Sequence, residues 1–438
     1  MRLLSTLSSV LAFLFSFPLC AQSGPDLELD TTFYVIPENA KALTPLFAPQ
    51  FFAVNVQNIG DEAANEVVVS CQITDLTIGE VIYSVEKNYG ELLAGESIEN
   101  DVLNEEAFNL PLTGFLSTRN YRGEYLVTTA SNDGNSLNDT ITFNFSSGYQ
   151  RFAKESGRTA GVPLTGSVNY VGNCFYIPQD ETLEVRELEF MVDNANELVA
   201  SEGVLSIYLY ETLGDQNEDG LIDSLEYDQV PIYFNEYLFT GQENQMLVRY
   251  PIDIDEESII LTGGKYYLLT LVYFGEDEAD NLIISVSDAY NYEATSAITA
   301  QNGVPQYANI SYSSNNLFAD RPIFILNGLG ANKSPVIRLI PFFIQNKVEE
   351  EELSPDYQVT IFPNPVKDNF TMTFDFPKPV ASRIAVFNQE GRLVKSYDPQ
   401  DIYQTTFREN FHNLPNGIYT LQIITEKGNT SKSIVIQH

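Results

Sequence analysis

The sequence has no tryptophan and only 4 methionines, 3 cysteines and 2 histidines in 438 residues. Both histidines, His412 and His438, lie near the C-terminus, so the rest of the chain has none. This excludes catalysis by a histidine base or a histidine-bound zinc ion from most of the molecule. A hydrolase that uses two carboxylates stays open, because 60 residues are acidic. The lack of tryptophan removes the usual sugar-stacking side chain, although tyrosine can replace it.

Basic residues are also few, at 23 against 60 acidic ones, which gives a formal net charge of -37. Such a surface repels nucleic acid and anionic lipid, so neither is an expected partner. The charge is uneven: residues 355–438 hold 8 acidic and 8 basic residues, which leaves 52 acidic and 15 basic residues upstream. We expect the upstream acidity to serve solubility outside the cell rather than an acidic active site.

The N-terminus has the pattern of a secretory signal peptide over residues 1–21. Arg2 precedes an apolar run over residues 3–19, and Ala21 provides a small residue for cleavage. Cys20 could suggest a lipoprotein, but Leu19 stands where a small residue would be needed. No other apolar run reaches about 18 residues, so we expect no transmembrane segment after signal removal.

Two cysteines, Cys71 and Cys174, are left in the mature chain, and they have no metal-like spacing. We expect two buried free thiols. A disulfide in an oxidising compartment is the alternative, and it requires the two predicted domains to meet at those strands.

Short alternating runs separated by turn residues predict an all-β fold, and 25 Tyr and 28 Phe support it. Helical periodicity is scarce. We predict tandem β-sandwiches, an immunoglobulin-like one over 22–150 and a jelly-roll-like one over 151–346, then an acidic linker over 347–355 and a last immunoglobulin-like domain over 356–438. Residues 51–74 should form one hairpin around an Asn-Ile-Gly-Asp turn, and residues 123–146 another across Asp133-Gly134. The segment VNVQNIGDEAANEVVVSCQI also resembles the CARDB group of immunoglobulin-like adhesion modules, which implies spacing or binding.

One local motif points to a metal ion. The sequence DQNEDGLIDSLE at 215–226 matches the twelve-residue calcium loop, with Gly220 at the sixth position, where the chain must turn, and apolar Ile222 at the eighth. A strand-like run precedes it and Pro231 follows, so we expect a strand-to-strand loop that holds a structural calcium ion, with a solvated acidic turn as the alternative. The predicted oxygen ligands are Asp215, Asn217, Asp219, the Leu221 carbonyl, Asp223 and Glu226.

The tail contains four motifs in a recognisable order: PNP at 363–365, GRLV at 391–394, LPNGIY at 414–419 and KSIV at 432–435. In order and spacing they resemble the type A C-terminal sorting domain of the Bacteroidota type IX secretion system. The resemblance implies passage of the inner membrane by the signal peptide, contact with the type IX machinery, and a passenger left on the outer-membrane surface or released outside the cell. The residues that carry it are Pro363, Asn364, Pro365, Gly391, Arg392, Gly417, Tyr419 and Lys432.

Together these features predict a secreted or cell-surface protein that binds or adheres and is not an enzyme, with a polysaccharide or a surface protein as its ligand. One alternative is a carbohydrate-binding protein in which Tyr266, Tyr267, Tyr290 and Tyr292 line one sheet face. The other is a glycoside hydrolase that acts through carboxylates.

Overall fold

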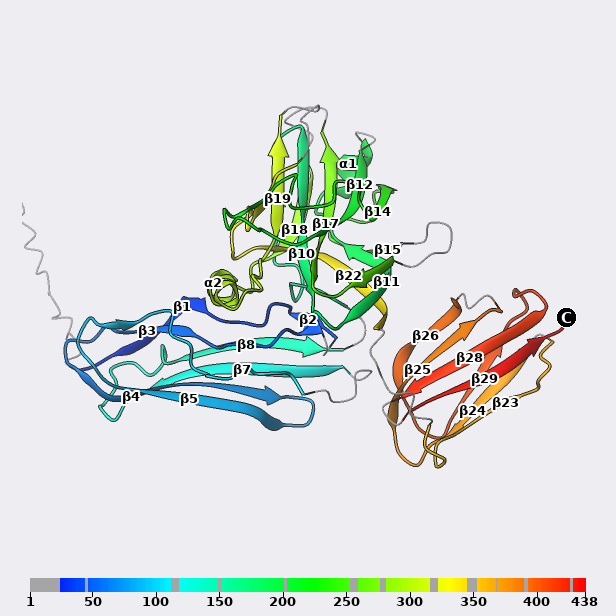
Figure 1. Cartoon of the computed structure of the whole chain (residues 1–438), viewed down its shortest axis with the longest axis horizontal. Coiled ribbons are helices and arrows are strands. Elements are labelled where there is room, and N and C mark those ends of the chain that lie inside the picture. Colours follow the sequence, from blue (N-terminus) through cyan, green and yellow to red (C-terminus); the bar gives the residue numbers. More distant parts are fainter. Residues whose placement is uncertain are drawn as a thin grey trace, which may run out of the picture.

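The computed structural model describes residues 24–438 except 44–45, 112–117, 149–150, 201–202, 253–258, 276–280, 316–321, 345–352, 368, 390–392 and 426–427. The predicted signal peptide, most of the acidic linker, and Gly391 and Arg392 therefore lie outside the described residues. The regular secondary structure of the rest is almost entirely strand, which confirms the all-β prediction (Figure 1). No helix among the described residues is long and apolar enough to cross a membrane.

The N-terminal region consists of two sheets around one core. One sheet has the order β1 (Leu27–Tyr34), β3 (Val54–Asn58), β6 (Ser97–Ile98). The other has the order β2 (Lys41–Ala42), β8 (Thr140–Ser147), β7 (Arg119–Thr128), β4 (Ala64–Asp75), β5 (Glu80–Leu92). Every second residue of β4 from Val67 to Ile73 is buried, and this row packs with Leu29 and Val56 of the first sheet.

The hairpin predicted over residues 51–74 is wrong. Strand β3 pairs with β1 and β6, whereas β4 pairs with β5 and β7, so the turn between them carries the chain from one sheet to the other. Asn58 fixes this crossing: its buried side chain donates to the carbonyls of Glu62 and Leu92 and accepts from the amides of Asp26 and Gly60. The second hairpin is confirmed, since β7 and β8 pair directly.

The middle region has a seven-stranded sheet and two smaller ones. The large sheet has the order β13 (Leu221–Ile222), β20 (Phe324–Leu326), β19 (Ile310–Ser314), β10 (Val168–Ile177), β17 (Lys265–Phe274), β12 (Val204–Thr212), β14 (Tyr233–Leu238). In the second sheet β11 (Thr182–Phe190) pairs with β15 (Val248–Pro251), β16 (Ile259–Thr262) and β22 (Ile337–Ile344). The third has the order β21 (Ser334–Pro335), β18 (Ile283–Ser287), β9 (Ala160–Pro163).

Both faces of the large sheet are covered with apolar side chains. On β10, Val171 and Phe175 join the main core, while Tyr170 and Cys174 join a second, tyrosine-rich cluster on the opposite face. Strands buried on both faces read as continuous apolar runs, which explains the sequence of β17, KYYLLTLVYF.

Two short helices, α1 (Ala195–Ala200) and α2 (Glu293–Gln301), interrupt the strands of this region. Helix α2 lies next to β1 of the N-terminal region (Figure 1). Ala294 and Ile298 of α2 are buried against Val35 and Ala53, and Tyr292, just before the helix, belongs to the N-terminal core. The N-terminal and middle regions therefore share hydrophobic packing.

The C-terminal region again has two sheets. One has the order β23 (Gln358–Phe362), β24 (Asn369–Asp375), β27 (Thr405–Asn410), and the other β26 (Leu393–Ile402), β25 (Val380–Phe387), β28 (Gly417–Thr425), β29 (Gly428–Ile436). Alternate residues of β24, such as Phe370 and Met372, pack with Leu421 and Ile434 from the second sheet in a core of their own.

Candidate functional sites

The acidic loop at 215–226 connects strands, as the sequence predicts. It follows β12, contains β13, and leads to β14. Within it, Leu221 and Ile222 pair with Ile325 and Phe324 of β20. Gly220 has a φ of 82°, a left-handed conformation that glycine adopts without strain. Ile222 is fully buried in the tyrosine-rich cluster, so the eighth position anchors the loop to the sheet.

The side-chain oxygens of the first half of the loop turn inward onto its backbone. Asp215 accepts hydrogen bonds from the amides of Asp219, at 3.2 Å, and Gly220, at 2.8 Å. Asn217 Oδ1 also accepts from the Asp219 amide, and Asp219 Oδ1 from the Leu221 amide, at 3.0 and 2.9 Å. The loop therefore keeps its curled form with its polar side chains directed at its own backbone.

Glu226 closes the loop. Its two carboxylate oxygens accept from the amides of Gln216, at 2.7 Å, and Asp223, at 2.9 Å, so it ties the end of the loop to its beginning and its middle. Asp223 Oδ1 accepts from the Leu225 amide at 2.7 Å. In this arrangement, no group of three or more His, Cys, Asp or Glu side chains among the described residues is placed to hold a metal ion.

An aromatic surface lies on the tyrosine-rich face of the large sheet, which the loop partly covers. Tyr208 of β12 pairs in register with Phe234 of β14, and their ring centroids are 4.8 Å apart. Tyr170 of β10 pairs with Tyr312 of β19, with centroids 5.8 Å apart. The three tyrosines are half-buried, and Phe234 is 43% exposed. We call these four residues the aromatic face.

The prediction that Tyr266, Tyr267, Tyr290 and Tyr292 line one sheet face is wrong, and the aromatic face consists of other residues. Tyr266 and Tyr267 are neighbours on β17 and point to opposite faces of the sheet, where both are buried. Tyr292 is buried in the N-terminal core and Tyr290 packs against it. The sequence does contain one indication of the aromatic face: the alternation YLY in β12 puts Tyr208 and Tyr210 on the same side of the strand.

The negative charges of the acidic loop also act on a tyrosine at this face of the sheet. Burial raises the pKa of Tyr307, which packs on the tyrosine-rich cluster, and the charges of Asp215 and Glu218 raise it further. The acidic loop therefore lies close enough to affect the ionisation of a tyrosine on this side of the sheet.

The two cysteines are free and buried, as expected. Cys71 belongs to the N-terminal core and Cys174 to the tyrosine-rich cluster. Burial raises the pKa of both thiols, that of Cys174 to about 12. Neither thiol therefore has the depressed pKa of a reactive cysteine.

In the C-terminal region, the Pro363-Asn364-Pro365 motif is attached to the last strand. The side-chain Nδ2 of Asn364 donates to the Ser433 carbonyl, and Oδ1 of the same side chain accepts from the Val435 backbone amide, both at 2.8 Å. The side chain thus takes the place of a backbone partner on β29. Val366 continues the contact, since its amide donates to the Val435 carbonyl at 2.7 Å.

The other described motif residues lie on the adjoining pair of strands. Gly417 begins β28, and the hydroxyl of Tyr419 on the same strand donates to the Pro415 carbonyl at 2.9 Å. Lys432 is exposed on β29 and pairs in register with Leu421. The motifs that are far apart in the sequence therefore meet around the last strand.

The C-terminal region is thus a two-sheet domain with its own core, in which the described motif residues meet around β29. Residues 360–437 match the family described as "Secretion system C-terminal sorting domain". The chain therefore carries a type IX sorting domain, which indicates interaction with the type IX secretion machinery and export to the cell surface or the extracellular space.

No curated protein matches the chain. Among solved structures, the crystal structure of dimeric latent PorU from Porphyromonas gingivalis is 11% identical, over 94% of this chain and 34% of that chain, with a TM-score of 0.16. The crystal structure of Ruminococcus gnavus beta-glucuronidase is 10% identical, over 62% and 36%, with a TM-score of 0.16. Its apo structure is 11% identical, over 69% and 41%, with a TM-score of 0.17. The chain thus spans well under half the length of these three structures.

Proposed function

We propose that the passenger is a non-catalytic binding or adhesion protein that its sorting domain delivers to the outside of the cell. The match of the tail to the sorting family carries the export part of this proposal. The absence of histidine upstream of His412 supports it, because the common nucleophilic and zinc mechanisms need that side chain.

One buried pair of carboxylates in the middle region gives further support. Glu155 and Glu189 both bind the Arg338 guanidinium, and all three side chains are buried. A glycosidase needs one carboxylic acid and one carboxylate facing a substrate cleft. Two carboxylates that share a buried arginine serve packing instead.

We also propose that the acidic loop holds a structural calcium ion through Asp215, Asn217, Asp219, the Leu221 carbonyl, Asp223 and Glu226. This set of hard oxygen ligands suits calcium, and the curled loop, with Gly220 at the turn and Ile222 anchored in the sheet, supports the assignment. The side chains would exchange their bonds to backbone amides for bonds to the ion. The ion would then hold β13 against β20.

Calcium titration with thermal melting of the full chain tests this site. Extracellular sites bind at roughly 10⁻⁴–10⁻³ M, so about 10 mM calcium should raise the free energy of unfolding by about 1.4–2.7 kcal/mol. Asp215→Ala should abolish the increase, whereas Glu218→Ala, which removes an exposed acid at a position that does not bind the ion, should keep it. A wild-type melting curve that does not respond to calcium would exclude the site.

A carbohydrate-binding protein is the second candidate, and the aromatic face favours it. Tyr208 and Phe234 offer adjoining, partly exposed rings on which a sugar could stack. A glycan array with the full chain tests this function. Tyr208→Ala should abolish the signal, while Phe362→Ala, which removes an exposed ring from the sorting domain, should not. Silence across all glycans would refute it.

A further inference from the structure

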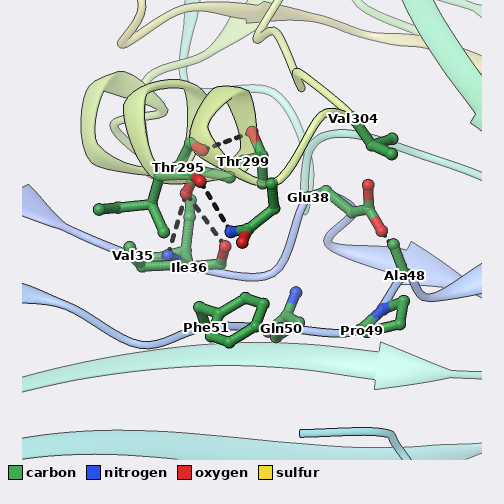
Figure 2. A pocket seen from close by; sticks show the side chains of 12 residues that line it. Val35, Ile36, Glu38, Ala48, Pro49, Gln50, Phe51, Thr295, Thr299 and Val304 are labelled. Carbon is green, nitrogen blue, oxygen red and sulfur yellow. Dashed lines mark hydrogen bonds between the residues drawn. The ribbon is translucent and has the colours of Figure 1, made fainter. Parts of the chain in front are cut away.

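A pocket of about 260 Å³ lies where the N-terminal region meets α2 (Figure 2). One wall is the segment that follows β1, from Val35 to Glu38, and the floor is the returning segment from Ala48 to Phe51. Helix α2 and the segment after it, which includes Val304, form the opposite wall. Residues from two distant parts of the sequence therefore enclose one space.

Hydrogen bonds between the two walls fix the shape of this pocket. The Ile36 amide donates to Thr295 Oγ1 at 3.1 Å, and the same hydroxyl donates to the Ile36 carbonyl at 3.0 Å. Thr299 Oγ1 donates to the Thr295 carbonyl and accepts from the Gln306 amide. Because buried groups hold both walls, the pocket is formed before any ligand enters.

Glu38 provides the one carboxylate of the pocket lining. Its side chain is only 4% exposed, and Oε1 accepts from the Ala48 amide at 2.6 Å. Its other oxygen, Oε2, accepts no hydrogen bond from a described residue. Oε2 is also not among the fully buried atoms, so it is open to the pocket. Figure 2 shows the carboxylate beside Ala48, with one oxygen directed toward Val304. Glu38 therefore presents an unused acceptor to the pocket.

The nearest buried cation does not use this acceptor. Lys154 is fully buried, and its Nζ donates to Gln306 Oε1 at 3.0 Å. Among the described residues it makes no direct ion pair with Glu38; burial raises the pKa of Glu38, and the charge of Lys154 acts in the opposite direction. The Glu38 carboxylate is buried with only part of its hydrogen-bonding capacity used, and such burial is costly. A hydrogen-bond donor on a ligand would therefore bind Glu38 more strongly than it would bind a carboxylate at the surface.

We propose that this pocket binds a primary ammonium group carried on a short aliphatic stem. Glu38 would accept the ammonium, and Ile36, Ile298 and Val304 would contact the stem. The pocket volume is far above the ~10–15 Å³ that admits one water, so the pocket has room for a small amine or one lysine side chain. The net charge of -37 attracts cations to the molecule as a whole. This site is independent of the calcium ion and the aromatic face.

Isothermal titration of the full chain with n-pentylamine and with the neutral 1-pentanol tests the proposal. Pentylamine should bind at least about tenfold more tightly, because a charge-assisted hydrogen bond is worth more than one tenfold step. Glu38→Gln should remove this preference and leave the weak binding of pentanol unchanged. Glu293→Gln, an equal change of charge at an exposed position on helix α2, which lines the pocket, should have no effect.

Two further measurements make the outcome decisive. Val304→Phe fills the rim of the pocket and leaves Glu38 intact, so it should weaken both ligands even if Glu38→Gln fails to fold. Nα-acetyl-lysine methylamide, which keeps its side-chain ammonium, distinguishes the two sources of the ligand. Its binding indicates a lysine side chain of a partner, whereas binding of pentylamine alone indicates a free amine. Equal affinity for pentylamine and pentanol, or no binding of either, would overturn the proposal.

Discussion

Strand β11 carries two glutamates that form ion pairs in opposite environments. Glu189 binds Arg338 of β22 at 3.2 Å and Arg151 at 2.8 Å. Arg338 also donates two hydrogen bonds to Glu155, at 2.5 and 3.0 Å. Two residues earlier on the same strand, Glu187 pairs with Arg249 of β15. Glu155, Glu189 and Arg338 of the first group are buried, whereas the side chains of the second pair are 33% and 55% exposed.

We expect Arg338→Met to lower the free energy of unfolding by about 3–5 kcal/mol, because it leaves the fully buried Glu155 without its cation. Arg249→Met breaks an ion pair of the same kind in solvent and should cost no more than about 1 kcal/mol. Both variants replace an arginine on a strand paired with β11, so the comparison sets a buried arginine that binds two glutamates against an exposed one that binds a single glutamate.

Urea unfolding followed by tyrosine fluorescence measures both losses, since the chain has 25 tyrosines and no tryptophan. Arg338→Met combined with Glu155→Gln should recover part of the loss, because the second change removes the unpaired charge. Equal losses for the two arginine variants would refute the reasoning that burial sets the strength of these pairs.

Two other predictions concern the N-terminal region and the sorting domain. Burial, and then the charges of Asp133 and Asp26, raise the pKa of Asp139 to about 6. The folded state therefore keeps a proton that the unfolded state releases near pH 4. The free energy of unfolding falls as the pH rises from about 4 to about 6. Asp139→Asn should therefore raise the free energy of unfolding by about 1–3 kcal/mol at pH 8 and leave it unchanged below pH 4, as measured by denaturation at both pH values; an equal effect at both would contradict the shift. In the sorting domain, Asn364→Ala removes two hydrogen bonds to β29 and should cost about 1–3 kcal/mol in a melting experiment, whereas Lys432→Ala, exposed on the same strand, should cost little.

The sequence predicted best those features that depend on local spacing. The alternation of Val67 to Ile73 identified a half-buried strand, and the order of four short motifs identified the sorting domain. The loop at 215–226 also has the predicted strand before it and the predicted anchor at Ile222. In each case neighbouring residues specify the feature, so a single stretch of sequence is enough.

Features that depend on which strands meet could not be predicted in the same way. Residues 51–74 contain two strands and a good turn, yet the strands enter different sheets, because the buried side chain of Asn58 holds the crossing through partners as far away as Leu92. Alternation also shows that Tyr208 and Tyr210 share a face but does not say whether that face is core or surface. Both outcomes follow from distant contacts.

The acidic loop shows how the local and the distant features combine. Its twelve-residue pattern is readable from the sequence, but its partner is β20, about a hundred positions later, and Phe324 of that strand packs against Tyr210 and Tyr170. An ion in the loop would therefore act on more than the loop: by holding β13 to β20 it would hold Phe324 beneath the aromatic face. Calcium and any ligand of that face would then stabilise the same packing, so each should strengthen the binding of the other.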